Sequence, residues 1–316
     1  MAAFQPLEER RWRRVGGYGN EVHRPCHNYR VENVCNWMVP EASGDDYCPS
    51  CRLTQVIPAL HKPENKQHWY KLELAKRRLI YSLQGLHLPI RSRAEDPERG
   101  LAFEFLEDTA AGEKVLTGHA SGVITLNVAE ADDARREQMR TAMGEPYRTL
   151  LGHLRHEVGH YFWDVLIADS PHLEGFRQWF GDERVDYVAS LQRHYAEGPR
   201  PDWESGYISA YATMHPWEDW AECFAHYLHM TDGLHTAENW GLQLQPVRAD
   251  RAPVEHVDIR QRAQDFDTLL FSQWLPMTRF LNSLNRSLGQ NDAYPFTISA
   301  PVVGKLRFID SVIRGR

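Results

Sequence analysis

The sequence of 316 residues predicts an α+β fold, in which a mainly helical domain with a small mixed sheet follows a small cysteine-rich module. Three observations lead to this prediction. Four of the five cysteines lie between residues 26 and 51. Two later stretches alternate apolar and polar residues, as half-buried strands do, and apolar residues recur at helical spacing through much of the chain after residue 147. We therefore expect an N-terminal segment over residues 1–22, the cysteine module over 23–60, and one large domain over 61–316.

The composition indicates a globular protein. Hydrophobic residues make up 42% of the chain and charged residues 25%, both ordinary values. The net charge of −7 at pH 7 disfavours nucleic acid and anionic membranes as partners. No apolar run is long enough to span a bilayer, and the first residues, MAAFQPLEERRWRR, lack the apolar core of a secretory signal. We expect a cytoplasmic protein.

The cysteine module has the residue types of a zinc ribbon. Its four cysteines follow the pattern C-x8-C-x12-C-x2-C: Cys26, Cys35, Cys48 and Cys51. In a reducing compartment such a cluster binds metal more often than it forms disulfides, and the last pair has the spacing of a loop wrapped around Zn²⁺. Because the first pair is unusually far apart, His23 or His27 is an alternative to one thiolate. We predict a structural zinc held by all four cysteines, against the alternative of free cysteines in a loop.

Between the module and the middle of the chain we predict one helix and two strands. The helix begins near Pro63 and ends at Gly85, a residue type that suits a helix C-terminus. The strands cover residues 101–106 and 122–128. The second strand is either a sheet edge that holds an extended peptide or a core strand with no such contact. Later helices are predicted over residues 171–180, 183–196, 217–230, 260–272 and 274–288.

The stretch from Leu151 to Asp164 contains an H-E-x-x-H motif, formed by His156, Glu157 and His160. Residues four apart share one helix face, so the two histidines can bind one metal ion. Zinc lowers the pKa of a bound water towards neutrality, and Glu157 could take its proton. A chance match on a structural helix is the alternative. However, the apolar pattern indicates a buried helix, where an unpaired Glu would be costly. The motif therefore predicts a catalytic zinc site.

A catalytic zinc usually has three protein ligands, so the later residues decide which class of site applies. The metzincin pattern requires Gly and His where this chain has Trp163 and Leu166, which excludes that class. A later helix, opened by Pro216, places Glu218 and Glu222 one turn apart on one face. One carboxylate can bind zinc while the other accepts the free ring N–H of a ligating histidine. The residues alone leave these two roles open.

Two tyrosines, Tyr207 and Tyr211, precede this later helix. A tyrosine hydroxyl near zinc can stabilise an oxyanion or protonate a leaving amine, although packing is the other common role of tyrosine. Five further histidines are polar candidates, each more often a surface or hydrogen-bonded core residue: His119, His153, His215, His226 and His229.

The combination of H-E-x-x-H with a later Glu-x3-Glu helix resembles the gluzincins. That resemblance implies Glu218 as the third zinc ligand and Glu222 as the acid that orients a histidine, with swapped roles as the alternative. Tyr211 lies seven residues before Glu218. This spacing is similar to that of the catalytic tyrosine in the protease domain of anthrax lethal factor, which implies that Tyr211 assists the oxyanion.

From about residue 23 the whole chain resembles bacterial zinc-binding metallopeptidases that join a cysteine ribbon to an H-E-x-x-H domain. The matching segments are Cys35-Asn36-Trp37, Cys48-x2-Cys51-Arg52-Leu53, RTLLGHLRHEVGHYFWD (148–164), YISAYATMHPWEDWAE (207–222) and NSLNRSLGQNDAYPF (282–296). Such proteins often carry a further C-x-x-C pair near the N-terminus, whereas residues 1–22 contain no cysteine. The resemblance implies a zincin-type metalloprotease domain with one catalytic zinc, and a ribbon with one structural zinc.

We therefore predict a zinc-dependent peptidase that hydrolyses peptide bonds with a zinc-activated water and with Glu157 as general base. Its expected partners are a peptide or protein substrate and, through the ribbon, another protein. The rival function is a non-catalytic zinc-binding interaction module, in which the ribbon docks a partner and the second zinc only stabilises the fold. A DNA-binding ribbon is a third option, disfavoured by the acidic net charge.

Overall fold

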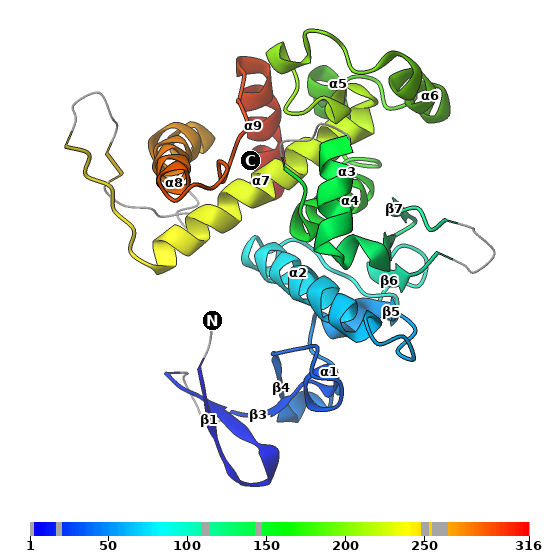
Figure 1. Ribbon diagram of the computed structural model, residues 1–316, viewed down its shortest axis with the longest axis vertical. Helices are drawn as coiled ribbons and strands as arrows, with labels where there is room; N and C mark the ends of the chain where they lie inside the picture. Colours follow the sequence, from blue (N-terminus) through cyan, green and yellow to red (C-terminus); the bar gives the residue numbers. More distant parts are fainter. Residues whose placement is uncertain are drawn as a thin grey trace. The chain divides into compact units, whose positions relative to one another are not determined.

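A computed structural model of the chain describes residues 3–16, 21–108, 114–142, 147–247, 253–254 and 265–315 (Figure 1). The chain divides into two compact units, Met1–Leu154 and Arg155–Arg316. The helix with the H-E-x-x-H motif, α4 (Leu150–Leu166), begins in the first unit and continues into the second. All residues of the motif belong to the second unit.

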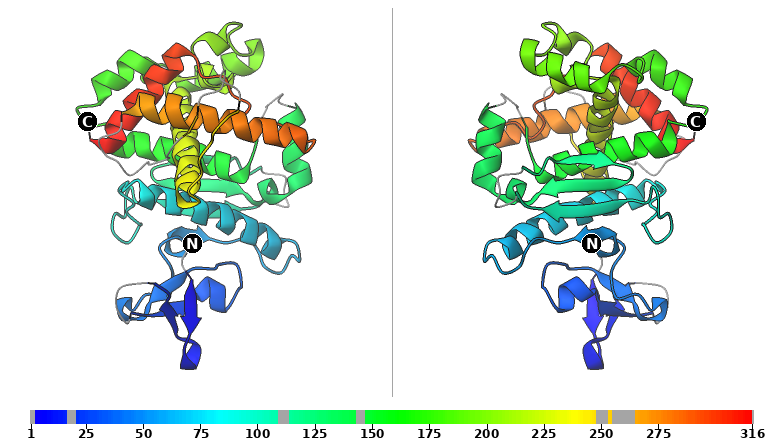
Figure 2. Two further views of the ribbon diagram at one scale, coloured as in Figure 1. Left: turned by 90° about the vertical axis from the view of Figure 1, so that its left-hand side faces the viewer. Right: turned by 90° about the vertical axis from the view of Figure 1, so that its right-hand side faces the viewer.

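The first unit starts with an antiparallel sheet in the order β1-β2-β3-β4 (Figure 2, dark blue). Its strands are β1 (Phe4–Pro6), β2 (Trp12–Arg14), β3 (Val22–Pro25) and β4 (Met38–Pro40). Cys26 follows β3 directly, the one-turn helix α1 (His27–Arg30) comes next, and Cys35 precedes β4. We did not predict these strands from the sequence, because three or four residues are too few to show an alternating pattern.

The second sheet of this unit is mixed, as predicted. The strands β5 (Thr54–Val56), β6 (Ala102–Leu106) and β8 (Val123–Asn127) run parallel, and β7 (Gly118–Ala120) pairs antiparallel with β8. The order β5-β6-β8-β7 makes β8 an inner strand. The hypothesis that residues 122–128 form a sheet edge is therefore wrong, because an inner strand already bonds to a neighbour on each side.

The helix α2 (Asn65–Gly85) connects the cysteine module to this sheet through a buried apolar face and three buried charged residues. Glu73 accepts a hydrogen bond from Thr54 Oγ1 at 2.7 Å and pairs with Lys76 at 3.0 Å. Arg77 Nη1 donates to the carbonyl of Val34 at 2.6 Å. Thr54 and Val34 both lie in the cysteine module, so α2 is attached to it by hydrogen bonds of buried charged residues. A shorter helix, α3 (Asp133–Ala142), follows the sheet and was not predicted.

The second unit is helical. Besides most of α4, it contains α5 (Leu173–Phe180), α6 (Tyr187–Glu197), α7 (Pro216–Asn239), α8 (Leu275–Ser287) and α9 (Ala300–Arg314). Of the helix predicted over residues 260–272, residues 260–264 lie outside the described residues. Residues 268–274 form a π-helical segment that continues directly into α8, without the predicted break. We did not predict α9, although its buried Val302, Leu306 and Ile309 recur at helical spacing.

Helix α7 is the centre of this unit (Figure 1, yellow). It packs against α5, α9, the π-helical segment and the short turn Tyr211–Thr213. Trp220, Phe224 and Tyr227 on α7 have no exposed surface, so the helix core is aromatic. The mainly helical unit and the small mixed sheet confirm the predicted α+β fold class. In the part of the chain that the structure describes, no helix combines the length and apolar character required to cross a membrane.

Candidate metal centres

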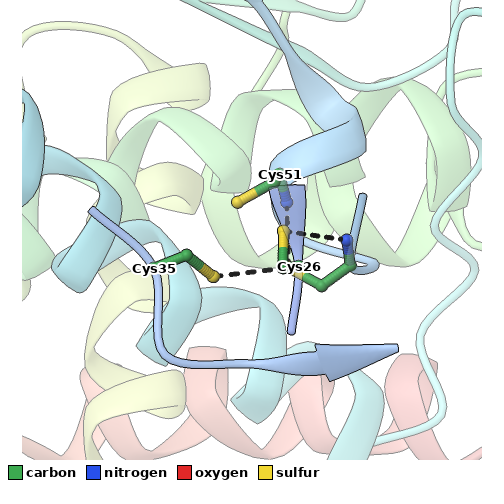
Figure 3. Close-up of side chains that lie close together, drawn as sticks. Cys26, Cys35 and Cys51 are labelled. Atoms are coloured by element: carbon green, nitrogen blue, oxygen red, sulfur yellow. Dashed lines mark hydrogen bonds between the residues drawn. The ribbon is translucent and has the colours of Figure 1, made fainter. Parts of the chain in front are cut away.

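The four cysteines predicted to bind zinc meet in the first unit. Each sulfur atom lies within 4.8 Å of the others, and all four side chains are buried. Figure 3 shows Cys26, Cys35 and Cys51 reaching one another from separate segments. Backbone N–H groups donate to the sulfurs: Trp37 to Cys35 at 3.4 Å, Cys48 to Cys26 at 3.3 Å, and Cys51 to Cys48 at 3.4 Å. Such bonds stabilise thiolates, the metal-binding form of cysteine.

The thiols perturb one another because they are so close. The hydrogen bond with Cys35 is the main cause that lowers the pKa of Cys26, and the hydrogen bond with Cys26 is the main cause that raises the pKa of Cys51. Four buried thiols at this spacing cannot all lose their protons without a cation between them, because the thiolates would repel one another. The donor set therefore fits a structural Zn²⁺ with four cysteine ligands.

The two histidines considered as substitutes for a thiolate lie outside this group. His23 Nε2 is 3.6 Å from the carboxylate of Glu21. The ring of His27 contacts the ring of Tyr47, with centroids 5.1 Å apart. The four cysteines alone form the group that the described residues offer to a metal in this module.

The second candidate centre lies where α4 and α7 meet. His156, His160 and Glu218 each offer a ligand atom, and these atoms all lie within 4.8 Å of one another. The Nε2 atoms of the two histidines are 3.2 Å apart. Glu218 Oε2 is 2.9 Å from His156 Nε2, and Glu218 Oε1 is 3.4 Å from His160 Nε2. The structure thus brings together the three residues predicted to hold a catalytic zinc.

Glu222 lies one turn after Glu218 and contacts the other ring nitrogen of His156. The distance from His156 Nδ1 to Glu222 Oε1 is 2.6 Å. Because a carboxylate accepts hydrogen bonds, the neutral ring keeps its proton on Nδ1, and the lone pair of Nε2 then faces His160 and Glu218. Glu218 thus belongs to the group that could hold a metal ion, whereas Glu222 contacts the other ring nitrogen of His156.

Burial and charge have opposite effects on the pKa values in this centre. Burial lowers the pKa of His156, but its hydrogen bonds with Glu218 and Glu222 outweigh burial and raise that pKa well above its usual value. Burial raises the pKa of Glu218, and the nearby His160 and His156 bring it well below its usual value. The surrounding carboxylates therefore favour positive charge between these side chains.

One oxygen of Glu218 shows that a metal ion fits here. When the neutral His156 ring carries its proton on Nδ1, the buried Glu218 Oε2 accepts no hydrogen bond from any residue that the structure describes, although His156 Nε2 is only 2.9 Å away. An unsatisfied buried acceptor raises the free energy of the folded state, and lone pairs that face each other repel. A zinc ion bound to these atoms would remove both penalties. Two histidines and one glutamate are also a known donor set of catalytic zinc.

The two helices come this close because Gly159 has no side chain. A Cβ atom on Gly159 would lie only 2.9 Å from Ala221 Cα. Trp220 Nε1 also donates to the Gly159 carbonyl at 2.9 Å, which fixes the same crossing point. His215 caps the start of α7 by accepting a hydrogen bond from Trp217 N at 3.1 Å, so Glu218 lies in the first helical turn.

The remaining predicted site residues, Glu157 and Tyr211, also lie at this centre. Glu157 is buried and next to His156 in the helix. The ring centroid of Tyr211 is 6.0 Å from that of His156, and its hydroxyl interacts with Tyr187. Burial is the main cause that raises the pKa of Tyr211, so its hydroxyl keeps its proton at neutral pH.

The other polar candidates have different contacts. The hydroxyl of Tyr207 accepts a hydrogen bond from Arg200 at 3.3 Å. His153 pairs with Glu130. Among the described residues, the two groups able to hold a metal include none of these five histidines: His119, His153, His215, His226 and His229.

Two contacts of the centre were not predicted from the sequence. Tyr187, at the start of α6, donates a hydrogen bond to Glu218 Oε1 at 2.8 Å. Lys305 on α9 lies 2.6 Å from the carboxylate of Asp219, the residue after Glu218. No local spacing signals either contact, because Tyr187 and Lys305 come from helices distant in sequence from α7.

Comparison with known proteins agrees with this arrangement. A family model described as "Putative zinc-binding metallo-peptidase" matches residues 65–312, and a model described as "zinc-ribbon domain" matches residues 1–62. Uncharacterized proteins of Mycobacterium bovis and of two Mycobacterium tuberculosis strains are 47% identical over 289 residues, or 91% of this chain and 82% of each relative. No solved structure matches the chain significantly. Because the first family model covers most of its length, the chain belongs to this zinc-binding metallopeptidase family and carries an N-terminal zinc-ribbon domain.

Proposed function

We propose that this chain is a zinc-dependent peptidase whose catalytic zinc is held by His156, His160 and Glu218. The observation that carries the proposal is the convergence of these three ligand atoms within 4.8 Å, with Glu157 beside them on α4. Catalytic zinc sites have three protein ligands, whereas structural sites have four. The rival function, a non-catalytic zinc-binding module, would require a fourth protein ligand. The group found among the described residues has three.

A zinc ion in this centre would lower the pKa of a bound water and polarise the carbonyl of a peptide bond. Glu157 accepts the proton of the attacking water and then donates it to the leaving amine. Glu222 keeps the proton of His156 on Nδ1, so that Nε2 is available as a ligand atom. Tyr211 donates from its hydroxyl to the developing oxyanion. The position of its ring beside that of His156 supports this role.

The cysteine module has a structural part in this proposal. A zinc ion on its four cysteines would hold together segments that have few apolar side chains of their own. The substrate is a peptide or a protein, and a protein partner binds through the ribbon. Reduced cysteines suit a cytoplasmic location.

The test compares a Glu157→Gln variant with the wild type. The amide keeps the shape of the side chain but cannot act as a base. We expect two zinc ions per chain in both proteins by elemental analysis, and cleavage of a diverse peptide library slower by about 100-fold or more in the variant. A His156→Ala/His160→Ala double variant is the control for the metal count, which should fall from two to one.

Three results would contradict parts of this proposal. Full activity of Glu157→Gln would refute the mechanism. Wild-type protein with two zinc ions that cleaves no member of the library would favour the non-catalytic function. One zinc ion per chain, unchanged in the double histidine variant, would refute the second metal centre.

A further inference from the structure

The two carboxylate oxygens of Glu218 have different neighbours. Oε1 accepts a hydrogen bond from the Tyr187 hydroxyl at 2.8 Å. Oε2 lies 2.9 Å from His156 Nε2, which has no proton to donate to it when the neutral ring carries its proton on Nδ1. Because the Glu218 side chain is 2% exposed, bulk water does not compete for either oxygen. Oε1, which also lies 3.4 Å from His160 Nε2, is therefore occupied by a protein donor, whereas Oε2 presents its lone pairs to His156 Nε2.

The position of Tyr187 is fixed by the residue that starts α7. His215 Nδ1 caps α7, and its opposite ring nitrogen, Nε2, donates to the carbonyl of Val185 at 3.0 Å. The ring of Tyr187 also packs against the ring of His215, with centroids 5.2 Å apart. Val185 is two residues before Tyr187, and His215 is three residues before Glu218. One histidine thus positions both partners of the Tyr187–Glu218 hydrogen bond.

We infer that Tyr187 is a positioning residue that makes Glu218 a monodentate ligand, bound through Oε2 alone. A hydrogen bond to a carboxylate is stronger than one between neutral groups. It uses one of the two lone pairs of Oε1 and so weakens this oxygen as a second donor to the same metal ion. Monodentate binding keeps the protein ligands at three donor atoms, the number that suits a zinc ion with a reactive water. The inference rests on the metal centre of the proposed function and is independent of hydrolysis.

Tyr187 and Tyr211 then have separate tasks, although their hydroxyls interact. The hydroxyl of Tyr187 contacts a metal ligand directly. The ring of Tyr211 lies beside His156 and also contacts the ring of His194, with centroids 5.7 Å apart. Loss of the Tyr187 hydroxyl should therefore change the coordination and affinity of the bound metal, whereas loss of the Tyr211 hydroxyl should lower the rate of hydrolysis.

The experiment uses Tyr187→Phe in the full chain, which removes the hydroxyl and keeps the ring against His215. Wild type and variant are stripped of zinc with a chelator and reloaded with Co²⁺. The visible d–d bands of Co²⁺ are strong in four-coordinate sites and weak in sites of higher coordination. Subtracting the spectrum of the His156→Ala/His160→Ala variant removes the contribution of the ribbon. Zinc affinity is measured separately by chelator competition.

We expect the freed Oε1 to bind the metal as well, so that the d–d absorbance of Tyr187→Phe falls. Its zinc dissociation constant should rise by about 10- to 100-fold, the usual effect of removing a partner of a metal ligand. Tyr195→Phe is the matched control, because Tyr195 lies on the same helix with 71% of its surface exposed. This control should change neither the spectrum nor the affinity.

An unchanged spectrum and affinity in Tyr187→Phe would overturn the inference. Weaker zinc binding with a wild-type spectrum would also overturn it, because Tyr187 would then only support the fold. These failures are distinguishable from failure of the proposed function. If the wild type binds no metal at the histidines, both fall; if Glu157→Gln is fully active, only the proposed mechanism falls.

Discussion

Replacing Gly159 with alanine should weaken zinc binding without removing any ligand. The new Cβ atom would lie 2.9 Å from Ala221 Cα, 3.2 Å from Ala221 O and 3.3 Å from Ala221 Cβ. Carbon atoms in contact normally remain about 3.5–4.0 Å apart. These neighbours are backbone atoms and a short side chain, so no rotamer change can relieve the clash. The helices α4 and α7 would have to separate by about 0.5–1 Å at this point.

This displacement is large for a metal site, in which the distances between ligand atoms and metal stay within about 0.2 Å of their usual values. Gly159 is next to His160, and Ala221 is three residues after Glu218, so the shift moves ligands on both helices. Overpacking costs about 1–3 kcal/mol of folding free energy, and the better helix propensity of alanine offsets about 1 kcal/mol. We expect a net loss of stability of about 0–2 kcal/mol, and zinc binding weaker by roughly 10- to 100-fold.

Chelator competition measures the zinc affinity, and urea unfolding of the zinc-free protein measures stability. Gly152→Ala is the matched control on the same helix. Its Cβ would meet side-chain atoms, Thr149 Oγ1 at 3.1 Å and Tyr147 Cε1 at 3.2 Å, which can move aside. The control should keep wild-type zinc affinity. Wild-type affinity in Gly159→Ala as well would refute the reasoning that this close crossing fixes the ligand geometry.

Two further predictions concern buried charged and titratable groups of the second unit. Lys305→Met should lower the free energy of unfolding by about 3–5 kcal/mol, because it leaves the buried carboxylate of Asp219 without its cation. Urea unfolding measures this loss, and adding Asp219→Asn should recover part of it; an unchanged midpoint in the single variant would contradict the prediction. Burial lowers the pKa of His226 from 6.5 to about 4, so the unfolded chain takes up a proton that the folded chain resists. The stability contributed by neutral His226 is complete above pH 6.5 and is lost as the pH falls towards 4. This stability amounts to about 2 kcal/mol between pH 7.5 and pH 5. Over that range the free energy of unfolding of His226→Gln, measured with urea, should fall by about 2 kcal/mol less than that of the wild type. An equal fall in the two proteins would contradict the prediction.

The ligand residues could be predicted because each set depends on short spacings. His156 and His160 are one helical turn apart, as are Glu218 and Glu222, and helix geometry turns such spacings into shared faces. The choice between the two glutamates required the structure, since both lie on the same face of α7. Our choice of Glu218 follows from the ring nitrogen of His156 that each carboxylate contacts.

Contacts between distant segments could not be predicted in this way. Tyr187 reaches Glu218 because His215 joins the starts of α6 and α7, and no periodic pattern reports such a junction. The strands β1 to β4 were missed for another reason. They are three or four residues long, too short for an alternating pattern, and their module holds its few buried residues around the cysteines.

The buried charges on α2 have a consequence for how this polypeptide can be divided. The matches to the two families meet between residues 62 and 65, inside the first compact unit. A fragment that begins at that boundary would keep Glu73 and Arg77 but lose their partners Thr54 and Val34. A fragment that ends there would lose the helix that covers its cysteines. We therefore expect that either part, expressed alone from this boundary, is less stable than it is within the intact first unit.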